Sequence, residues 1–111
     1  MTSPKINWLA QRISALILMP LTLWFIYKLI KFDNYSYSKI LSFFESVINS
    51  SLFLIMVAIM LYHSKIGLQM IAEDYIYSSN FRNNIIFLIN ILSYLLMVVS
   101  VLSIIIIQLS K

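Results

Sequence analysis

The chain has 111 residues, of which 61% are hydrophobic and 11% are charged, and its formal net charge is +4 at pH 7. A water-soluble domain of this length could not bury so much apolar surface. Cysteine is absent, which excludes disulfides and thiolate-bound metals. The Lys and Arg residues cluster at the ends of the apolar segments, where lipid headgroups lie. The composition therefore predicts a membrane protein and argues against nucleic-acid binding.

The first apolar segment extends from Ile13 to Ile30. Its length is close to the roughly 20 residues that an α-helix needs to cross the hydrocarbon layer. Arg12 precedes it, Lys28 and Lys31 close it, and no small-residue cleavage site follows it. We therefore expect a retained membrane helix and not a secretory signal. Pro20, in its middle, removes a backbone donor and indicates a bend that neighbouring helices cover.

Two further apolar segments follow, residues 46–71 and residues 85–108. The connectors and the head are too short to fold outside the membrane. Residues 1–111 are therefore expected to form one all-α transmembrane domain of three helices. In the third segment, small and polar side chains recur every three or four residues and suit close helix packing in lipid: Asn90, Ser93, Met97 and Ser100.

The second segment contains the only histidine of the sequence, His63, and its only glycine, Gly67. A neutral imidazole is a suitable axial ligand for haem iron, and a residue without a Cβ atom one turn away leaves room for a porphyrin. The alternative is a histidine that is hydrogen-bonded to a neighbouring helix. On a helical projection, both residues share one stripe with Leu52, Met56, Met70 and Asp74, whereas Lys65, Gln69 and Glu73 follow another face.

A second axial ligand would have to approach the iron from the opposite side, so the helix that carries His63 cannot supply it. The candidates are Met19 or Met97, from the other two segments, or a residue of another chain. Three helices enclose a macrocycle poorly. The sequence therefore favours a ligand from another chain.

The spacing H-x₃-G-x₆-D-Y, present as His63, Gly67, Asp74 and Tyr75, resembles the cytochrome b small subunit, a membrane anchor of succinate dehydrogenase. The stretch WLAQRISALILMPLTLWF, with Arg12 at the mouth of the first helix, resembles the start of the same family. The resemblance implies that the chain forms half of a helical bundle, which a second anchor chain completes. It also implies a mitochondrial inner membrane or a bacterial cytoplasmic membrane as the location.

The same resemblance implies roles for single residues. His63 would be an axial ligand of a b-type haem shared with the second anchor chain, with Gly67 beside it and Arg12 paired with a haem propionate. Tyr75 and Asp74 would belong to a ubiquinone site. The chain would dock the iron–sulfur subunit and the flavoprotein subunit, and it would contribute to electron transfer and quinone binding without a catalytic residue of its own.

Two rival functions remain open on the residues alone. One is a proton-pathway subunit of another respiratory complex, such as the three-helix K-type subunit of NADH–quinone oxidoreductase. That function needs carboxylates in mid-membrane, whereas Glu45, Glu73 and Asp74 lie at helix edges. The other is a purely structural anchor, in which Arg12 binds headgroups and Tyr75 is an interfacial aromatic. A visible haem spectrum would separate these classes.

Overall fold

The computed structural model describes residues 3–111, in which the regular structure is entirely α-helical. Three long helices, α1 (Pro4–Ile30), α3 (Val47–Tyr75) and α4 (Ser79–Ser110), are each long and apolar enough to cross a membrane. A short helix, α2 (Tyr37–Glu45), lies between α1 and α3 in the sequence. The predicted all-α fold with three membrane-spanning helices is confirmed.

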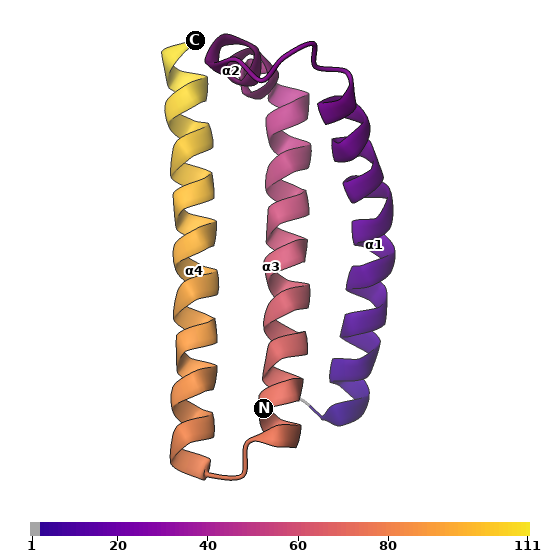
Figure 1. The fold of residues 1–111 in the computed structure, drawn as a ribbon, viewed down its shortest axis with the longest axis vertical. Coiled ribbons are helices and arrows are strands. Elements are labelled where there is room, and N and C mark those ends of the chain that lie inside the picture. Colours follow the sequence, from indigo (N-terminus) through magenta and orange to yellow (C-terminus); the bar gives the residue numbers. More distant parts are fainter. Residues whose placement is uncertain (1–2) are drawn as a thin grey trace.

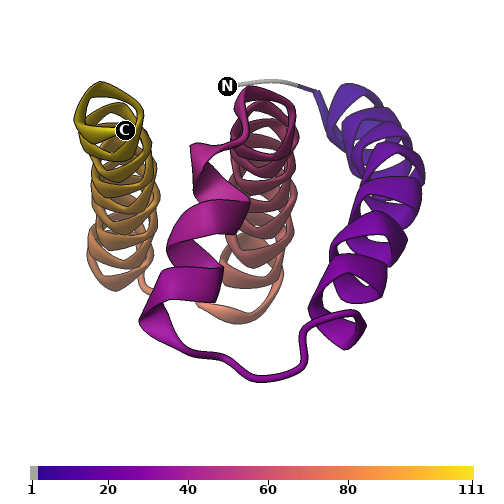
Figure 2. The ribbon, with the colours of Figure 1, turned by 90° about the horizontal axis from the view of Figure 1, so that it is seen from above.

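The three long helices lie side by side, with α3 in the middle (Figure 1). Helix α3 packs against both α1 and α4, whereas the backbones of α1 and α4 do not approach each other closely within the described residues. Seen from above, the three long helices form a curved row, and α2 lies across their ends, packed against α3 and α4 (Figure 2). Consecutive long helices are antiparallel, so the start of α1 lies near the end of α3.

The spans extend beyond the predicted apolar segments because polar residues form the terminal turns. A serine caps the start of each helix, and its hydroxyl oxygen accepts a hydrogen bond from a backbone N–H of the first turn. Such caps satisfy donors that have no partner inside the helix. The four capping residues are Ser3, Ser36, Ser46 and Ser78.

Helix α2 occupies most of what the sequence predicted as a connector. It ends at Glu45, and only Ser46 separates it from α3, so its last carbonyl groups cannot be satisfied by a longer helix. Side chains of α3 and α4 donate hydrogen bonds to these carbonyl groups instead. Gln108 Nε2 donates to the carbonyl oxygens of Phe44, at 2.8 Å, and of Glu45, at 3.2 Å. Asn49 Nδ2 donates to the carbonyl oxygen of Phe43 at 3.2 Å.

An aromatic cluster joins α1, α2 and α3 at the same end. Phe43 of α2 is 8% exposed and lies with its ring centroid 4.9 Å from that of Phe44. Phe44 in turn lies 4.9 Å from Phe53 of α3, and Phe53 lies 5.5 Å from Phe25 of α1. Pairs at these separations and tilts add to the free energy of burial. The cluster therefore holds α1 and α3 in a fixed register.

Candidate functional site

The first half of α1 and the second half of α3 lie side by side (Figure 1). Residues of these two stretches line a hollow of about 320 Å³. Two of the predicted site residues, His63 and Arg12, both line it. The remaining lining is largely apolar or aromatic. The complete set is Trp8, Gln11, Arg12 and Ala15 from α1, with His63 and Met70 from α3.

One ring nitrogen of His63 is engaged by the neighbouring helix. Nδ1 lies 2.8 Å from the hydroxyl oxygen of Ser14, which is 5% exposed. The Ser14 hydroxyl also donates to the carbonyl oxygen of Gln11 at 3.0 Å. The predicted alternative, a histidine hydrogen-bonded across helices, is therefore confirmed for Nδ1. Because no partner within residues 3–111 contacts Nε2, this bond is compatible with a ligand role for the ring.

Arg12 lies at the rim of this hollow, with its guanidinium carbon 5.2 Å from the centroid of the Trp8 ring. The contact orients the guanidinium without neutralising its charge. Among residues 3–111 the ion pair is between Lys39 and Asp33, so no carboxylate of this part of the chain pairs with Arg12. The rim therefore presents a cation that an external carboxylate can reach.

Helix α1 approaches α3 closely at Gly67. A Cβ atom on Gly67 would lie 2.9 Å from Nε2 of Gln11, which is too close for real side chains. The space that the glycine leaves is therefore occupied by the Gln11 amide. The Oε1 atom of that amide is buried and has no hydrogen-bond partner in the described chain. Gly67 acts on the hollow indirectly, because it lets Gln11 lie back against α3.

Tyr75 and Asp74 are the last two residues of α3 and do not line the His63 hollow. Both are exposed, Tyr75 to 75%. At 1.5 Å per residue, Tyr75 lies about 18 Å along the helix axis from His63. These two residues thus belong to a separate location at the edge of the membrane-spanning part.

Neither methionine considered as a second axial ligand lines the His63 hollow. Met19 is 61% exposed on α1 and is absent from the lining. Met97 lines a different, apolar hollow on α4 with Tyr94 and three aliphatic residues. Met70 does line the His63 hollow, but it lies on the same helix as His63. A second ligand from another chain therefore remains the prediction.

Sequence reasoning did not identify Gln11 and Ser14 as neighbours of His63. Nor did it single out Trp8, which holds the Arg12 guanidinium. A pattern on α1 was available, because Trp8, Gln11 and Ala15 recur at spacings of three and four residues and therefore share one helix face. The spacing alone does not predict that this face of α1 packs against the His63 side of α3.

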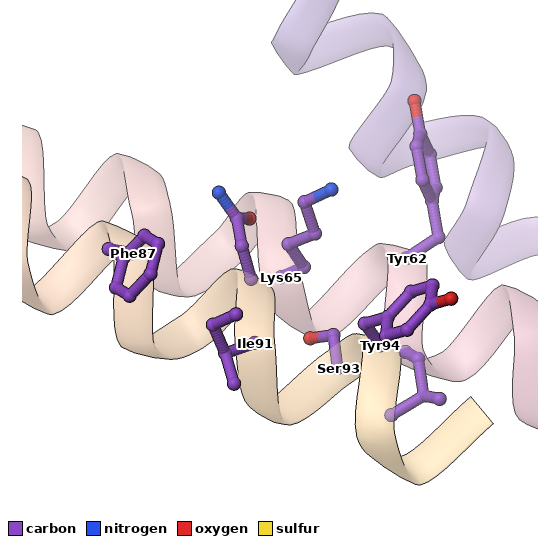
Figure 3. A pocket seen from close by; sticks show the side chains of 8 residues that line it. Tyr62, Lys65, Phe87, Ile91, Ser93 and Tyr94 are labelled. Carbon is purple, nitrogen blue, oxygen red and sulfur yellow. The ribbon is translucent and has the colours of Figure 1, made fainter. Parts of the chain in front are cut away.

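A larger hollow, of about 570 Å³, lies between α3 and α4 (Figure 3). Tyr62 and Lys65 of α3 line it, opposite a face of α4 that includes Asn90 and Ser93. Two of the four residues predicted as a packing stripe thus face α3. Its lining contains neither histidine nor methionine, the side chains that ligate haem iron in cytochromes. The chemistry of His63, and not the larger volume, identifies the candidate site.

Comparison with known proteins gives consistent matches. Residues 2–107 match the model of the family described as succinate dehydrogenase/fumarate reductase transmembrane subunit. Succinate dehydrogenase hydrophobic membrane anchor subunits of three bacteria are similar to the chain. The Rickettsia bellii protein is 36% identical over 92 residues, which are 83% of this chain and 74% of the relative. The Rickettsia prowazekii protein is 34% identical over 92 residues, with the same coverage of both.

The Rickettsia typhi protein is 32% identical over 98 residues, which are 88% of this chain and 78% of the relative. No solved structure matches the chain. The match over almost the whole sequence, together with three antiparallel spans, confirms the predicted resemblance and the predicted multi-pass membrane location. The chain therefore belongs to the succinate dehydrogenase/fumarate reductase transmembrane subunits, within them to the hydrophobic membrane anchors of succinate dehydrogenase.

Proposed function

We propose that this membrane anchor of succinate dehydrogenase binds one b-type haem through His63, shares it with a second anchor chain, and contributes Tyr75 and Asp74 to a ubiquinone site. The observation that carries the proposal is the hollow between α1 and α3, which is lined by an imidazole and by a guanidinium that pairs with no carboxylate of residues 3–111. Family membership makes a subunit of another respiratory complex the weaker alternative.

The residues around the hollow fit the edge of a haem. His63 has one ring nitrogen without a partner in residues 3–111, Ala15 and Met70 provide an apolar wall, and Arg12 stands at the rim. A planar guanidinium matches a carboxylate through two parallel hydrogen bonds, which suits a haem propionate. A bound b-type haem would supply a one-electron centre inside the membrane. The role of this chain would be to hold that group and orient it.

The case for a second anchor chain rests on ligation and on exposed surface. His63 is the only histidine of the sequence, and the two candidate methionines do not line its hollow. Leu16 and Leu23 of α1 are also 67% and 63% exposed, and in a membrane either lipid or a second helical chain can cover them. A second chain at this face would bring a ligand to the iron.

The ubiquinone role rests on the position and chemistry of Tyr75. A quinone has two carbonyl oxygens and takes up two protons with two electrons, so its site needs hydrogen-bond donors near the membrane edge. The phenol of Tyr75 is such a donor at the end of α3, whereas an ionised Asp74 is an acceptor and would orient its neighbours. The exposure of both residues leaves them accessible to the iron–sulfur and flavoprotein subunits, which we expect to dock at this end.

The haem role is tested by His63→Ala in the intact complex. The absorption of the reduced haem should be lost or shifted, because no other histidine of this chain can replace the ligand. Ser64→Ala is the matched control, since its exposed side chain is adjacent in sequence and does not line the hollow. An assembled His63→Ala complex with an unchanged haem spectrum would contradict the ligand assignment.

The quinone role is tested separately by Tyr75→Phe, which removes only the hydroxyl. Succinate-to-ubiquinone transfer should slow about tenfold, as expected for one lost hydrogen bond in a site. Succinate oxidation with an artificial acceptor at the soluble subunits should continue at the normal rate. Tyr77→Phe, at a residue that is 92% exposed two positions further on, is the control. Equal quinone reduction in both variants would make Tyr75 an interfacial anchor.

A further inference from the structure

Ser14 is one of two polar residues that are buried within the described chain, and it links α1 to α3. Its hydroxyl oxygen lies 2.8 Å from His63 Nδ1 and 3.0 Å from the carbonyl oxygen of Gln11. The Gln11 carbonyl has only lone pairs to offer, so the Ser14 hydroxyl must be the donor in that contact. The other contact can then be satisfied in only one way.

We propose, on the basis of the proposed haem ligation, that Ser14 is a positioning residue that keeps the His63 proton on Nδ1 and so leaves Nε2 as the iron-binding atom. A serine hydroxyl has one proton and two lone pairs. With its proton directed at Gln11, its oxygen accepts from Nδ1–H of His63. A neutral imidazole carries one N–H, so Nε2 holds the free lone pair.

The opposite arrangement satisfies fewer groups. If Ser14 donated to Nδ1, the contact with the Gln11 carbonyl would have no proton, and Nε2 would carry a hydrogen. An Nε2–H atom cannot bind iron. The other side chains that line the hollow are Trp8, Gln11, Arg12, Ala15 and Met70, and within the described chain the ring is hydrogen-bonded to Ser14 and to none of these. The serine is therefore the group that selects the tautomer.

A fixed tautomer also fixes the plane of the ring. The imidazole is held by its Cβ atom on α3 and by Nδ1 on α1, so it cannot turn about its own bond without breaking the contact with Ser14. Hydrogen bonds of this kind orient metal-binding histidines and raise the basicity of the ligating nitrogen. A hydroxyl acceptor is weaker than a carboxylate. We therefore expect an effect at the lower end of the roughly 10-fold to 100-fold range in metal affinity.

The test uses the whole complex with four variants of this chain. Ser14→Thr keeps the hydroxyl, Ser14→Cys replaces it with a thiol, which is a weaker acceptor, and Ser14→Ala removes the acceptor. Ser100→Ala is the matched control, because the Ser100 hydroxyl donates at 2.8 Å to the carbonyl oxygen of Leu96 within its own helix. The readouts are the rate of haem loss to apomyoglobin and the electron paramagnetic resonance spectrum of the ferric haem.

The rate of haem loss should increase as the acceptor at residue 14 becomes weaker. Haem loss should be about tenfold faster in Ser14→Ala, intermediate in Ser14→Cys, and unchanged in Ser14→Thr and Ser100→Ala. The ferric spectrum should shift in the same order. If Ser14→Ala assembles poorly, the comparison of Ser14→Cys with Ser14→Thr decides the question with side chains of similar size.

The outcomes separate the ligand role from the positioning role. If haem loss and spectrum are the same in Ser14→Ala, Ser14→Cys and the unmodified complex, while His63→Ala abolishes the haem signal, the positioning role is refuted and the ligand role stands. If Ser14→Thr loses haem as fast as Ser14→Ala, the hydroxyl is not the cause and the inference is also refuted. A haem spectrum that is unchanged in an assembled His63→Ala complex refutes both.

Discussion

Gly67→Ala is expected to disturb the wall of the His63 hollow through Gln11. The new Cβ atom would lie 2.9 Å from Gln11 Nε2, closer than real Cβ atoms pack against such a group. The Gln11 side chain is flexible, so relief comes from swinging its amide away from α3. Gln11 lines the hollow, and the space available to the displaced amide is the hollow itself, of about 320 Å³.

Two opposing effects determine how much Gly67→Ala changes the stability of the anchor. Overpacking of a close contact costs about 1–3 kcal/mol. Replacing Gly by Ala in a helix interior stabilises by about 1 kcal/mol. The net expectation is a destabilisation of about 0–2 kcal/mol, together with weaker haem retention because the displaced amide enters the site. A change in stability near zero could mean that the two effects cancel, so Gly67→Ala must also be measured in a chain that lacks the Gln11 amide.

A double-mutant cycle with Gln11→Ala isolates the contact. Truncation at residue 11 removes the amide that the new methyl group would strike, so only the helix-propensity gain remains. Gly67→Ala should then be neutral or stabilising by up to about 1 kcal/mol. The assay is thermal dissociation of the anchor from the purified complex, with haem content measured in parallel. If Gly67→Ala has the same effect with Gln11 and with Ala at residue 11, the glycine does not accommodate Gln11 and the reasoning is wrong.

Three further changes test other parts of the structure. Gln108→Leu removes two hydrogen bonds to α2 carbonyl groups and should destabilise the anchor by about 1–3 kcal/mol, measured by the same thermal dissociation. Arg12→Lys keeps the charge but loses the planar group that stacks on Trp8, so haem loss should accelerate while assembly is maintained. A hydrogen bond from Lys39 lowers the pKa of Asp33, so this pair should contribute at neutral pH and its contribution should vanish as the pH falls below about 4. Because the Asp33 side chain is 87% exposed, this contribution is small, and Asp33→Asn should lower the dissociation temperature at pH 7 only slightly; a large drop would refute this.

The sequence predicted the three spans because hydropathy depends on local composition. It placed the start of the first span at Ile13, whereas α1 begins at Pro4, since Ser3 caps a polar first turn that hydropathy does not detect. It missed α2 for a related reason. A helix of nine residues is too short to be distinguished from a connector by periodicity, and its end is stabilised by Gln108, which lies 63 residues beyond Glu45 in the sequence.

His63 and Arg12 were predictable because their side chains are rare in apolar helices and therefore conspicuous. Ser14 and Gln11 were not, because serine and glutamine near a helix end are ordinary. Their contacts with His63 and Gly67 form only where α1 packs against α3. The distinction is physical: the chemistry of an isolated side chain can be predicted from its type, whereas the proton that a neighbour donates or accepts depends on helix packing.

Helices α1 and α3 pack in one antiparallel register, which continues on both sides of Pro20. At the far end, Phe25 of α1 packs on Phe53 of α3 with ring centroids 5.5 Å apart. Moving from Phe25 to Ser14 and from Phe53 to His63 covers nearly equal lengths of the two helices, and those two residues form the hydrogen bond. The aromatic contact and the polar contact therefore constrain each other, since α1 cannot slide at one end without shifting at the other. Within the described residues α1 has no close backbone approach to α4, so the position of Ser14 relative to His63 is set by packing on α3 and by the ring contacts of α1 with Phe43 of α2. The orientation of the imidazole thus depends on the aromatic cluster at the opposite end of the span.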